Sequence, residues 1–305
     1  MQFKRTKRLI NGVLLIDKPL GFSSNQALQK VKWLYQAAKA GHTGTLDPLA
    51  TGLLPICLGE ATKFAQYVTN ADKTYVATIK FGATTTTGDV EGAVLNTSEV
   101  NFTRPQLDLA CQQFIGEISQ LPPMYSALKH EGRSLYEYAR AGVEIERQPR
   151  LITIQSINVS TYETDVAQVS VVCSKGTYIR TLAEDIGTAL GCGAHLIGLR
   201  RTETAGYLMQ DAVTIEQLEA MTNEAREALL LPVDSAIESL PKIILNADAA
   251  FFIKQGQAVW QAGNTRIDIN AGCDLRLYDE ANNFFGLGFL HNDGKIAPKR
   301  LVNFG

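Results

Sequence analysis

The chain has 305 residues, of which 45% are hydrophobic and 20% are charged, as in an ordinary soluble globular protein. This length favours one large domain with an addition, or two domains. A net charge of −2 excludes a generally basic nucleic-acid-binding protein, so any RNA surface must come from local clusters of basic residues.

The cysteines and the N-terminal segment bear on the compartment. Five cysteines are scattered along the chain without a C-x-x-C pair, which favours reduced core thiols over a disulfide framework or a zinc site. The apolar run at residues 13–16 is too short for a secretory signal, and no run approaches the length of a membrane span. We therefore expect a cytoplasmic protein with no membrane contact, no metal and no cofactor.

The first elements are a strand and a helix. Residues 13–16 predict a short buried strand, which DKPLGFSS at residues 17–24 follows. Ser24 or Asn25 can cap the next helix. The apolar face of that helix consists of Leu28, Val31, Tyr35 and Ala38.

A glycine-rich loop and an apolar segment follow at residues 39–63, KAGHTGTLDPLATGLLPICLGEATK. Gly41 and Gly44 permit backbone angles closed to other residues and let another molecule approach closely. Pro48 disfavours the α region for Asp47, so this carboxylate should sit on extended or turn-like backbone. Such an acid is a candidate for chemistry, although an Asp-Pro step by itself is more often a simple turn.

The next segments predict a strand, a loop and a helix. Alternating apolar residues at 73–82 indicate a half-buried strand, in which the pattern alone makes Tyr75 a core residue. The polar stretch GATTTTGDVEG at residues 82–92 is expected to be a loop. From Thr103 to Phe114 we expect a capped helix.

Basic and aromatic residues interleave in LPPMYSALKHEGRSLYEYARAGVEIERQPR, residues 121–150. This pattern suits phosphate contact combined with stacking on unpaired bases. Glutamates dilute the charge, so a salt-bridged surface is the alternative. The basic members are Lys129, Arg133, Arg140, Arg147 and Arg150.

The remaining segments alternate between strands and helices. Residues 152–159 and 166–173 read as two strands, and SKGTYIRT, which follows them, opens a helix. Arg180 falls beside the apolar stripe of that helix, where the pattern alone favours a side chain that extends to solvent. Residues 218–231 are helical in pattern. After a connector at 240–249, short β-like runs predict a small β domain.

Several of these stretches together resemble the TruB family, the bacterial-type tRNA pseudouridine-55 synthases. The similar stretches are DKP and GFSS, GHTGTLDPLATGLLPICLGEATK, PPMYSALKHEGRSLYEYARAG, SKGTYIRTLAEDIG and GAHLIGLRRTETAGY. One departure lies at Thr86, because the family commonly has Thr-Asp-Thr where this chain has three threonines. We expect that change to alter only hydrogen bonding within the loop.

The resemblance implies a set of site residues. Asp47 would be the catalytic aspartate, Tyr75 would stack on the target base, and Arg180 would pair with Asp47. Tyr178 would take part in proton transfer. The residues implied for substrate or RNA binding are Lys18, His42, Lys129, Arg133, Arg140, Leu199 as a pocket wall, Arg200 and Arg201.

The resemblance also implies an α+β fold, with a mixed, largely antiparallel sheet flanked by helices (the pseudouridine synthase fold) and a small C-terminal β (PUA-like) domain. We expect a catalytic domain at residues 1–240, with an RNA-binding insertion around 105–150, and a PUA-like RNA-binding domain at 241–305. The expected activity is isomerisation of uridine 55 in the T-loop of tRNA, on a flipped-out base and by a monomer bound to the T-arm stem-loop. A non-catalytic tRNA-binding or tRNA-folding protein on the same scaffold is one alternative. An aspartate-nucleophile hydrolase is another.

Overall fold

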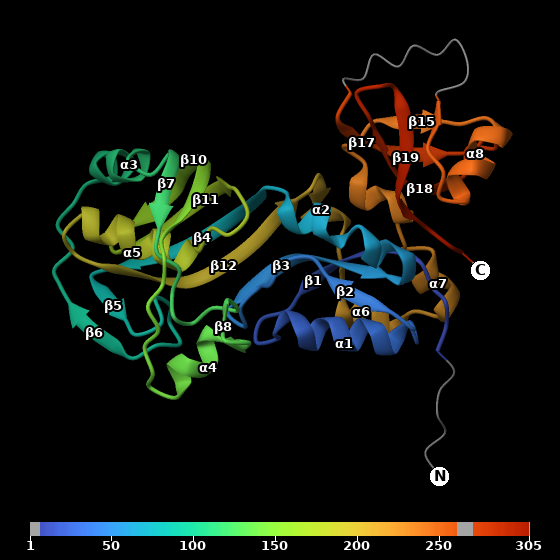
Figure 1. Cartoon of the computed structure of the whole chain (residues 1–305). Coiled ribbons are helices and arrows are strands. Elements are labelled where there is room, and N and C mark those ends of the chain that lie inside the picture. Colours follow the sequence, from blue (N-terminus) through green and yellow to red (C-terminus); the bar gives the residue numbers. More distant parts are fainter. Residues whose placement is uncertain (1–6, 261–270, 305) are drawn as a thin grey trace.

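The computed structural model describes residues 7–260 and 271–304, and these form a long sheet with helices around it and a smaller C-terminal sheet (Figure 1). The fold is α+β, as predicted. Within the described residues the large sheet has ten strands in the order β14-β1-β3-β12-β4-β11-β10-β7, with β13 beside β12 and β2 beside β3. Its strands are β1 (Gly12–Lys18), β2 (Ala40–His42), β3 (Ala50–Leu58), β4 (Lys73–Phe81), β7 (Gly116–Gln120), β10 (Arg150–Glu163), β11 (Val166–Cys173), β12 (Ala194–Thr204), β13 (Tyr207–Leu208) and β14 (Val213–Thr214).

Most neighbouring strands of this sheet are antiparallel, and β1–β14 and β3–β12 are parallel. The helices that surround it are α1 (Ser24–Leu34), α2 (Ala65–Asn70), α3 (Arg104–Gln112), α4 (Leu135–Arg140), α5 (Ile179–Ala189), α6 (Ile215–Ala220) and α7 (Asn223–Glu227). Three 3-10 turns are η1 (Gly59–Lys63), η2 (Met209–Asp211) and η3 (Val233–Ile237). Two small hairpins pair β5 (Ala83–Thr85) with β6 (Val94–Thr97) and β8 (Lys129–His130) with β9 (Arg133–Ser134).

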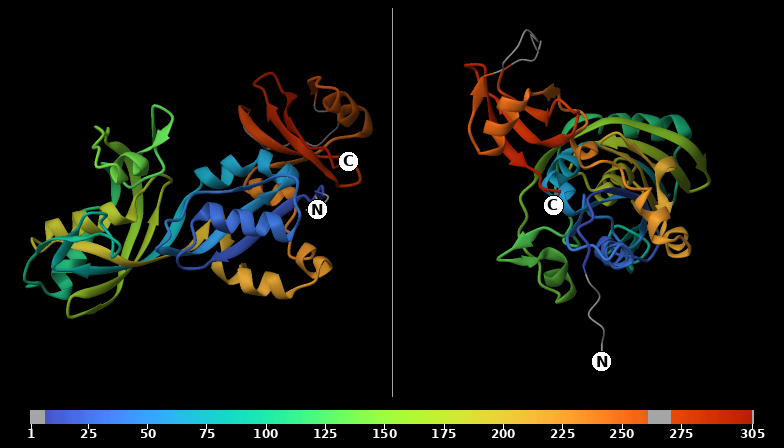
Figure 2. Two further views of the ribbon diagram at one scale, coloured as in Figure 1. Left: turned by 90° about the horizontal axis from the view of Figure 1, so that it is seen from below. Right: turned by 90° about the vertical axis from the view of Figure 1, so that its right-hand side faces the viewer.

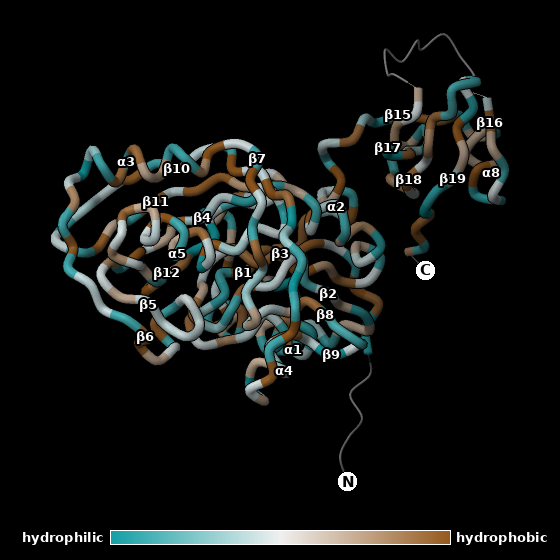
Figure 3. The backbone as a smooth tube through the Cα atoms, turned by 60° about the vertical axis from the view of Figure 1, so that its left-hand side comes forward, coloured by the Kyte–Doolittle hydropathy of each residue, from teal (hydrophilic) through white to brown (hydrophobic). Residues whose placement is uncertain are grey.

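The predicted strands and helices follow the local sequence pattern closely. In β4 every second residue is buried from Lys73 to Phe81, because a strand presents alternate side chains to opposite faces. Figure 3 shows hydrophobic and hydrophilic segments following one another along the chain. The cap of helix α1 precedes both predicted candidates, Ser24 and Asn25: it is Ser23, whose hydroxyl accepts from Gln26 N–H at 3.2 Å in a capping box.

The large sheet is covered on both faces near β1. Leu14 and Ile16 join the main core beneath α1, whereas Val13 and Leu15 face a second apolar cluster formed with η1, α2 and η3. A strand buried on both faces reads as a continuous hydrophobic run, which is why residues 13–16 carry no alternation.

The C-terminal sheet has the order β15-β17-β18-β19-β16 and packs beside α2 at one end of the molecule (Figure 1). Phe284 meets Phe64 edge-on at 5.7 Å, and Leu287 joins the second apolar cluster. The elements are β15 (Lys242–Ile244), α8 (Ala247–Lys254), β16 (Val259–Trp260), β17 (Cys273–Tyr278), β18 (Phe284–Leu290) and β19 (Lys295–Leu301).

Two sequence predictions are wrong in this half of the chain. Residues 240–249 are no plain connector, because β15 pairs there with β17 and α8 starts at Ala247. Residues 218–231 do not form one helix: α6 ends at Ala220, and the Thr222 side chain caps α7. A threonine that caps is indistinguishable by periodicity from one inside a helix.

Three further features concern the surface, the cysteines and the length of the helices. The segment that carries α4 projects away from the large sheet (Figure 2, green). Four of the five cysteines are buried and unpaired, as predicted. None of the helices in the described ranges is long and apolar enough to cross a membrane.

Candidate active site

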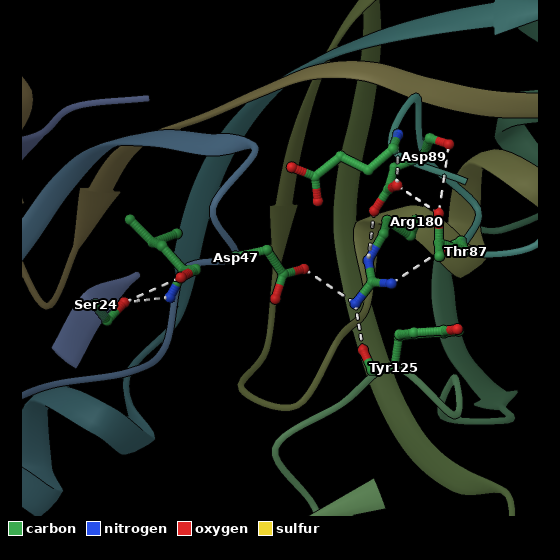
Figure 4. Close-up of polar contacts among 8 residues, drawn as sticks. Ser24, Asp47, Thr87, Asp89, Tyr125 and Arg180 are labelled. Carbon is green, nitrogen blue, oxygen red and sulfur yellow. Dashed lines mark hydrogen bonds and ion pairs between the residues drawn. The ribbon is translucent and has the colours of Figure 1, made fainter. Parts of the chain in front are cut away.

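Asp47 lies on the loop between β2 and β3, and α1 holds that loop in place. The Ser24 hydroxyl accepts from Leu46 N–H at 2.7 Å and donates to Leu46 O at 3.1 Å (Figure 4). Gly44 has φ 92°, and a Cβ there would stand 3.3 Å from Arg201 Nη1, so this position requires glycine. The loop therefore presents the Asp47 carboxylate from a fixed backbone, as the Gly-rich sequence predicted.

Arg180, in the first turn of α5, gathers the site around its guanidinium (Figure 4). Its Nη2 lies 3.0 Å from Asp47 Oδ2 and also donates to Tyr125 O at 2.6 Å. Nη1 donates to Thr87 O at 2.9 Å, and Nε lies 3.7 Å from Asp89 Oδ2. Only 6% of the side chain is exposed, so the solvent-exposed alternative for Arg180 is wrong.

Asp89 is a site residue to which sequence reasoning gave no role. Its carboxylate is buried, accepts from Thr87 Oγ1 at 2.5 Å and Glu91 N–H at 3.1 Å, and faces the Arg180 guanidinium. The loop at 82–92 offered one signal, an acid retained among threonines and glycines. Nearby, Thr86 Oγ1 accepts from Ala93 N–H at 3.1 Å, which agrees with a role in the hydrogen bonding of the loop.

A cavity of about 520 Å³ opens beside this cluster, within the size range of small-molecule sites. Burial raises the pKa of Tyr75 and of Tyr178, and the nearby Asp47 carboxylate raises both further. Both phenols are therefore protonated at neutral pH and can donate a hydrogen bond. The six predicted residues that line the cavity are Asp47, Tyr75, Tyr178, Arg180, Leu199 and Arg201.

Lys18 does not reach the surface, contrary to the expectation that it contacts RNA. Its ammonium is buried and donates to Pro19 O at 2.9 Å and to Phe22 O at 2.5 Å. Burial lowers the pKa of Lys18 to about 8, although the neighbouring Asp47 and Asp17 carboxylates act in the opposite direction. The lysine thus holds the turn after β1 and adds positive charge behind Asp47.

Arg201 is also buried, so its expected phosphate contact does not fit its position either. Its Nε donates to Leu53 O at 2.7 Å, and its Nη2 lies 3.5 Å from Gly44 O. Through these two contacts, Arg201 links the loop that carries Asp47 to strand β3. At the preceding position, Arg200 is partly exposed and forms a two-pronged pair with Asp17, with its Nη2 2.7 Å from Oδ2.

Full-length relatives decide the family. The chain is 58% identical over 302 residues to the tRNA pseudouridine synthase B of Methylobacillus flagellatus, covering 99% of this chain and 98% of the relative. It belongs to the TruB family of pseudouridylate synthases. The TruB enzyme of Nitrosospira multiformis, tRNA pseudouridine synthase B, is 50% identical over 305 residues, covering 98% of this chain and 97% of the relative.

Family models cover the chain in three sections. Residues 32–179 match the TruB family pseudouridylate synthase N-terminal domain, residues 180–238 the tRNA pseudouridylate synthase B C-terminal domain, and residues 241–302 the C-terminal model of pseudouridine synthase II TruB. Among solved structures, a chain of the Cbf5-Nop10-Gar1 complex superposes with a TM-score of 0.74 at 26% identity, over 97% of this chain and 86% of that one. The pseudouridine synthase fold expected from the sequence is confirmed.

Four of the five basic residues singled out at 121–150 are exposed, namely Lys129, Arg133, Arg140 and Arg150. The fifth, Arg147, is largely buried and donates to Pro122 O at 3.1 Å. Arg133 lies over the Tyr138 ring at 4.9 Å, and Arg140 lies over Tyr136 at 5.5 Å. Lys129 is exposed on the β8–β9 hairpin. Arg133 also approaches Glu137 at 3.7 Å, as the alternative of a salt-bridged surface expects, and the contact of this segment with RNA stays a prediction.

His42 ends β2, close to the Asp47 loop. Its Nδ1 is buried without a hydrogen-bond partner among the residues that the structure describes. Burial lowers the pKa of His42, and the positive charge of Arg201 lowers it further, so the imidazole is neutral at pH 7. In residues 7–260 and 271–304, no three His, Cys, Asp or Glu side chains are grouped as metal ligands would be.

Proposed function

We propose that this protein isomerises uridine 55 in the T-loop of tRNA to pseudouridine, and that Asp47 is the catalytic aspartate. The observation that supports this role most strongly is the Asp47–Arg180 pair at the cavity. Arg180 is buried, but 42% of the Asp47 side chain is exposed, so one carboxylate is both held in place and reachable. The TruB relatives, named tRNA pseudouridine synthase B, supply the reaction and the substrate.

The reaction breaks the bond between uracil N1 and the ribose, rotates the base and forms a new bond from C5. The proton at C5 leaves, and N1 gains one, so no oxidant or reductant is consumed. A carboxylate can serve as the nucleophile or the base in such an exchange. Asp47 fits either role, because its free carboxylate surface faces the cavity while Arg180 holds the other side.

The uracil must leave its stack to reach Asp47, which costs a few kcal/mol. Tyr75 lines the cavity and offsets part of that cost, because stacking on an aromatic ring contributes about 1–3 kcal/mol per base. Leu199 forms an apolar wall. Tyr178 keeps its proton at neutral pH and therefore acts as a donor.

The proposed substrate surface extends from the cavity over the insertion at 105–150. Exposed Lys129, Arg133 and Arg140 would contact the phosphates of the T-arm. We propose that Arg200, which follows the cavity residue Leu199, and His42, two residues before the cavity residue Gly44, also contact the RNA. We assign residues 1–240 to the catalytic domain and 241–305 to a PUA-like RNA-binding domain. We propose that the enzyme works in the cytoplasm as a monomer.

The non-catalytic alternative, a tRNA-binding or tRNA-folding protein, does not need the buried cluster around Arg180. Burying a guanidinium with a carboxylate, as Arg180 and Asp89 are buried, is often no better for stability than an apolar core. The hydrolase alternative needs free acids for phosphate or metal, and Asp89 is already engaged by Thr87, Glu91 N–H and Arg180. Both alternatives therefore leave the arrangement unexplained.

The test is to incubate the pure protein with an unmodified tRNA transcript and to label pseudouridine with carbodiimide. Before labelling, we expect no change in the mass of the RNA, because isomerisation adds and removes no atoms. After labelling, we expect one labelled position, uridine 55. A transcript with cytidine at that position is the control and should remain unlabelled. Tight tRNA binding without any isomerisation would instead support the non-catalytic alternative.

A further inference from the structure

Ser126 carries a buried hydroxyl that the proposed mechanism does not use. It follows Pro122-Pro123 at the start of the α4 segment, and only 5% of the residue is exposed. Its Oγ makes no hydrogen bond of acceptable geometry within the described parts of the chain. Ser126 lines the same cavity as Asp47. Buried hydroxyls in native proteins are nearly always paired, so an unpaired one at a binding cavity calls for a partner from outside the chain.

The position of Ser126 is fixed relative to the catalytic pair. Its own N–H donates to Met124 O at 2.9 Å, and its carbonyl accepts from Tyr136 N–H at 3.1 Å. The preceding carbonyl, Tyr125 O, accepts from Arg180 Nη2 at 2.6 Å (Figure 4). The same guanidinium group thus anchors both the Asp47 carboxylate and the backbone that carries the Ser126 hydroxyl.

Tyr178, a neighbour of Ser126, is held equally firmly. The Gln120 side chain, itself buried, accepts from Tyr178 N–H at 2.8 Å and donates to Tyr178 O at 3.1 Å. The Ser126 hydroxyl contacts the Tyr178 phenol, with an alignment too poor for a full hydrogen bond, and this contact offsets part of the rise in the pKa of Tyr178 that burial causes. Two hydroxyl groups on rigid backbone therefore stand together at the cavity, and within the described residues the one on Ser126 has no well-aligned hydrogen-bond partner.

We propose that Ser126 Oγ donates a hydrogen bond to a carbonyl oxygen of the uracil while the base occupies the cavity. This inference rests on the proposed function. Uracil offers two carbonyl acceptors, and both persist when the base detaches and rotates. A hydroxyl can turn about its C–O bond to follow them, whereas a backbone donor cannot. Because Ser126 gives up only its poorly aligned contact with Tyr178, most of the new hydrogen bond is a net gain when the base enters.

The first test is Ser126→Ala, compared with Ser98→Ala, which changes an exposed serine just after β6 and outside the insertion at 105–150. We expect Ser126→Ala to lower kcat/KM about tenfold, as the loss of one neutral hydrogen bond does. The affinity for tRNA should change less than twofold, and Tm should hardly change, since the hydroxyl has no well-aligned hydrogen bond in the described part of the free protein. Ser98→Ala should match the wild type throughout.

The second test replaces one oxygen of the target uridine by sulfur, a weaker acceptor, in transcripts that carry 2-thiouridine or 4-thiouridine. The wild type should slow several-fold with one of the two, and Ser126→Ala should show no further loss with that same RNA. Equal slowing of both proteins by both analogues would overturn the contact. So would a variant with wild-type kcat/KM, or one whose Tm falls by several degrees, which would make Ser126 structural.

The outcomes distinguish a failure of the Ser126 contact from a failure of the proposed function on which it rests. A wild-type protein that forms no pseudouridine in the unmodified transcript overturns the proposed function and the Ser126 contact together. A wild type that is active, alongside an equally active Ser126→Ala variant, overturns the Ser126 contact alone.

Discussion

Replacing Asp89 by asparagine should destabilise the protein more than the same change at Asp47, although Asp47 lies nearer to Arg180. The relevant distances are 3.7 Å from Arg180 Nε to Asp89 Oδ2 and 3.0 Å from Nη2 to Asp47 Oδ2. The two carboxylates differ in their access to water: 5% of the Asp89 side chain is exposed, against 42% of Asp47. Water therefore weakens the attraction between Arg180 and Asp47, whereas the attraction between Arg180 and the buried Asp89 is hardly screened.

The size of the effect follows from these environments. Two unit charges about 4 Å apart interact by about 4 kcal/mol at an effective dielectric constant near 20. Breaking a buried pair costs about 3–5 kcal/mol, and Asp47 still compensates Arg180 in part, so we expect about 2–3 kcal/mol for Asp89→Asn. The half-exposed pair should contribute below about 1 kcal/mol, which is the expected loss for Asp47→Asn.

Urea and thermal unfolding of the two variants and the wild type measure this difference. The amide that replaces the Asp89 carboxylate would keep an acceptor for Thr87 Oγ1 and Glu91 N–H, so the change removes charge with little change of shape. For a domain of this size, Asp89→Asn should lower Tm by about 5–10 °C. Asp165→Asn, which breaks an exposed pair with Lys80, is the control and should cost almost nothing. Equal losses for Asp47→Asn and Asp89→Asn would refute the role assigned to burial.

Three further changes test other parts of the structure. Thr86→Asp should leave turnover within a few-fold, because Thr86 only braces its loop, and a hundredfold loss would show a rebuilt site. Between pH 8 and 10.5 folded Lys18, with its pKa of about 8, loses a proton that the unfolded chain keeps, so its contribution to the free energy of unfolding rises with pH. In Lys18→Met the slope of the free energy of unfolding against pH should be smaller than in the wild type, by up to about 1.4 kcal/mol per pH unit. Equal slopes in the two proteins would contradict the lowered pKa of Lys18. A chain that ends at Leu245 should aggregate, since it exposes Phe64 and its cluster. Soluble, cooperatively unfolding protein would disprove that.

Local sequence patterns predicted the parts of the fold that local physics decides. Alternation at 73–82 gave β4, and the glycines and proline around Asp47 gave a constrained loop. These predictions hold because the backbone preferences and the side-chain period act within a few residues. The four predicted catalytic residues do line one cavity.

Local patterns could not show which distant residues meet. Asp89 pairs with an arginine ninety-one positions later in the chain, and nothing in the loop at 82–92 encodes that contact. The same reason explains the error at Lys18, since a lysine in a surface-like turn reads as exposed until the fold buries it. The sequence around Ser126 likewise does not show that its hydroxyl is buried at the cavity without a well-aligned hydrogen-bond partner among the described residues.

The most direct test of the central claim is to compare the wild type with Asp47→Asn on an unmodified full-length tRNA. Gel-shift affinity and pseudouridine yield, the latter by carbodiimide labelling, are measured on the same preparations. Asparagine keeps nearly the shape of aspartate and removes its negative charge, so we predict tRNA affinity within about twofold of the wild type and no isomerisation. Substantial turnover by the variant, after the mass of the protein has confirmed the substitution, would contradict Asp47 as the catalytic residue.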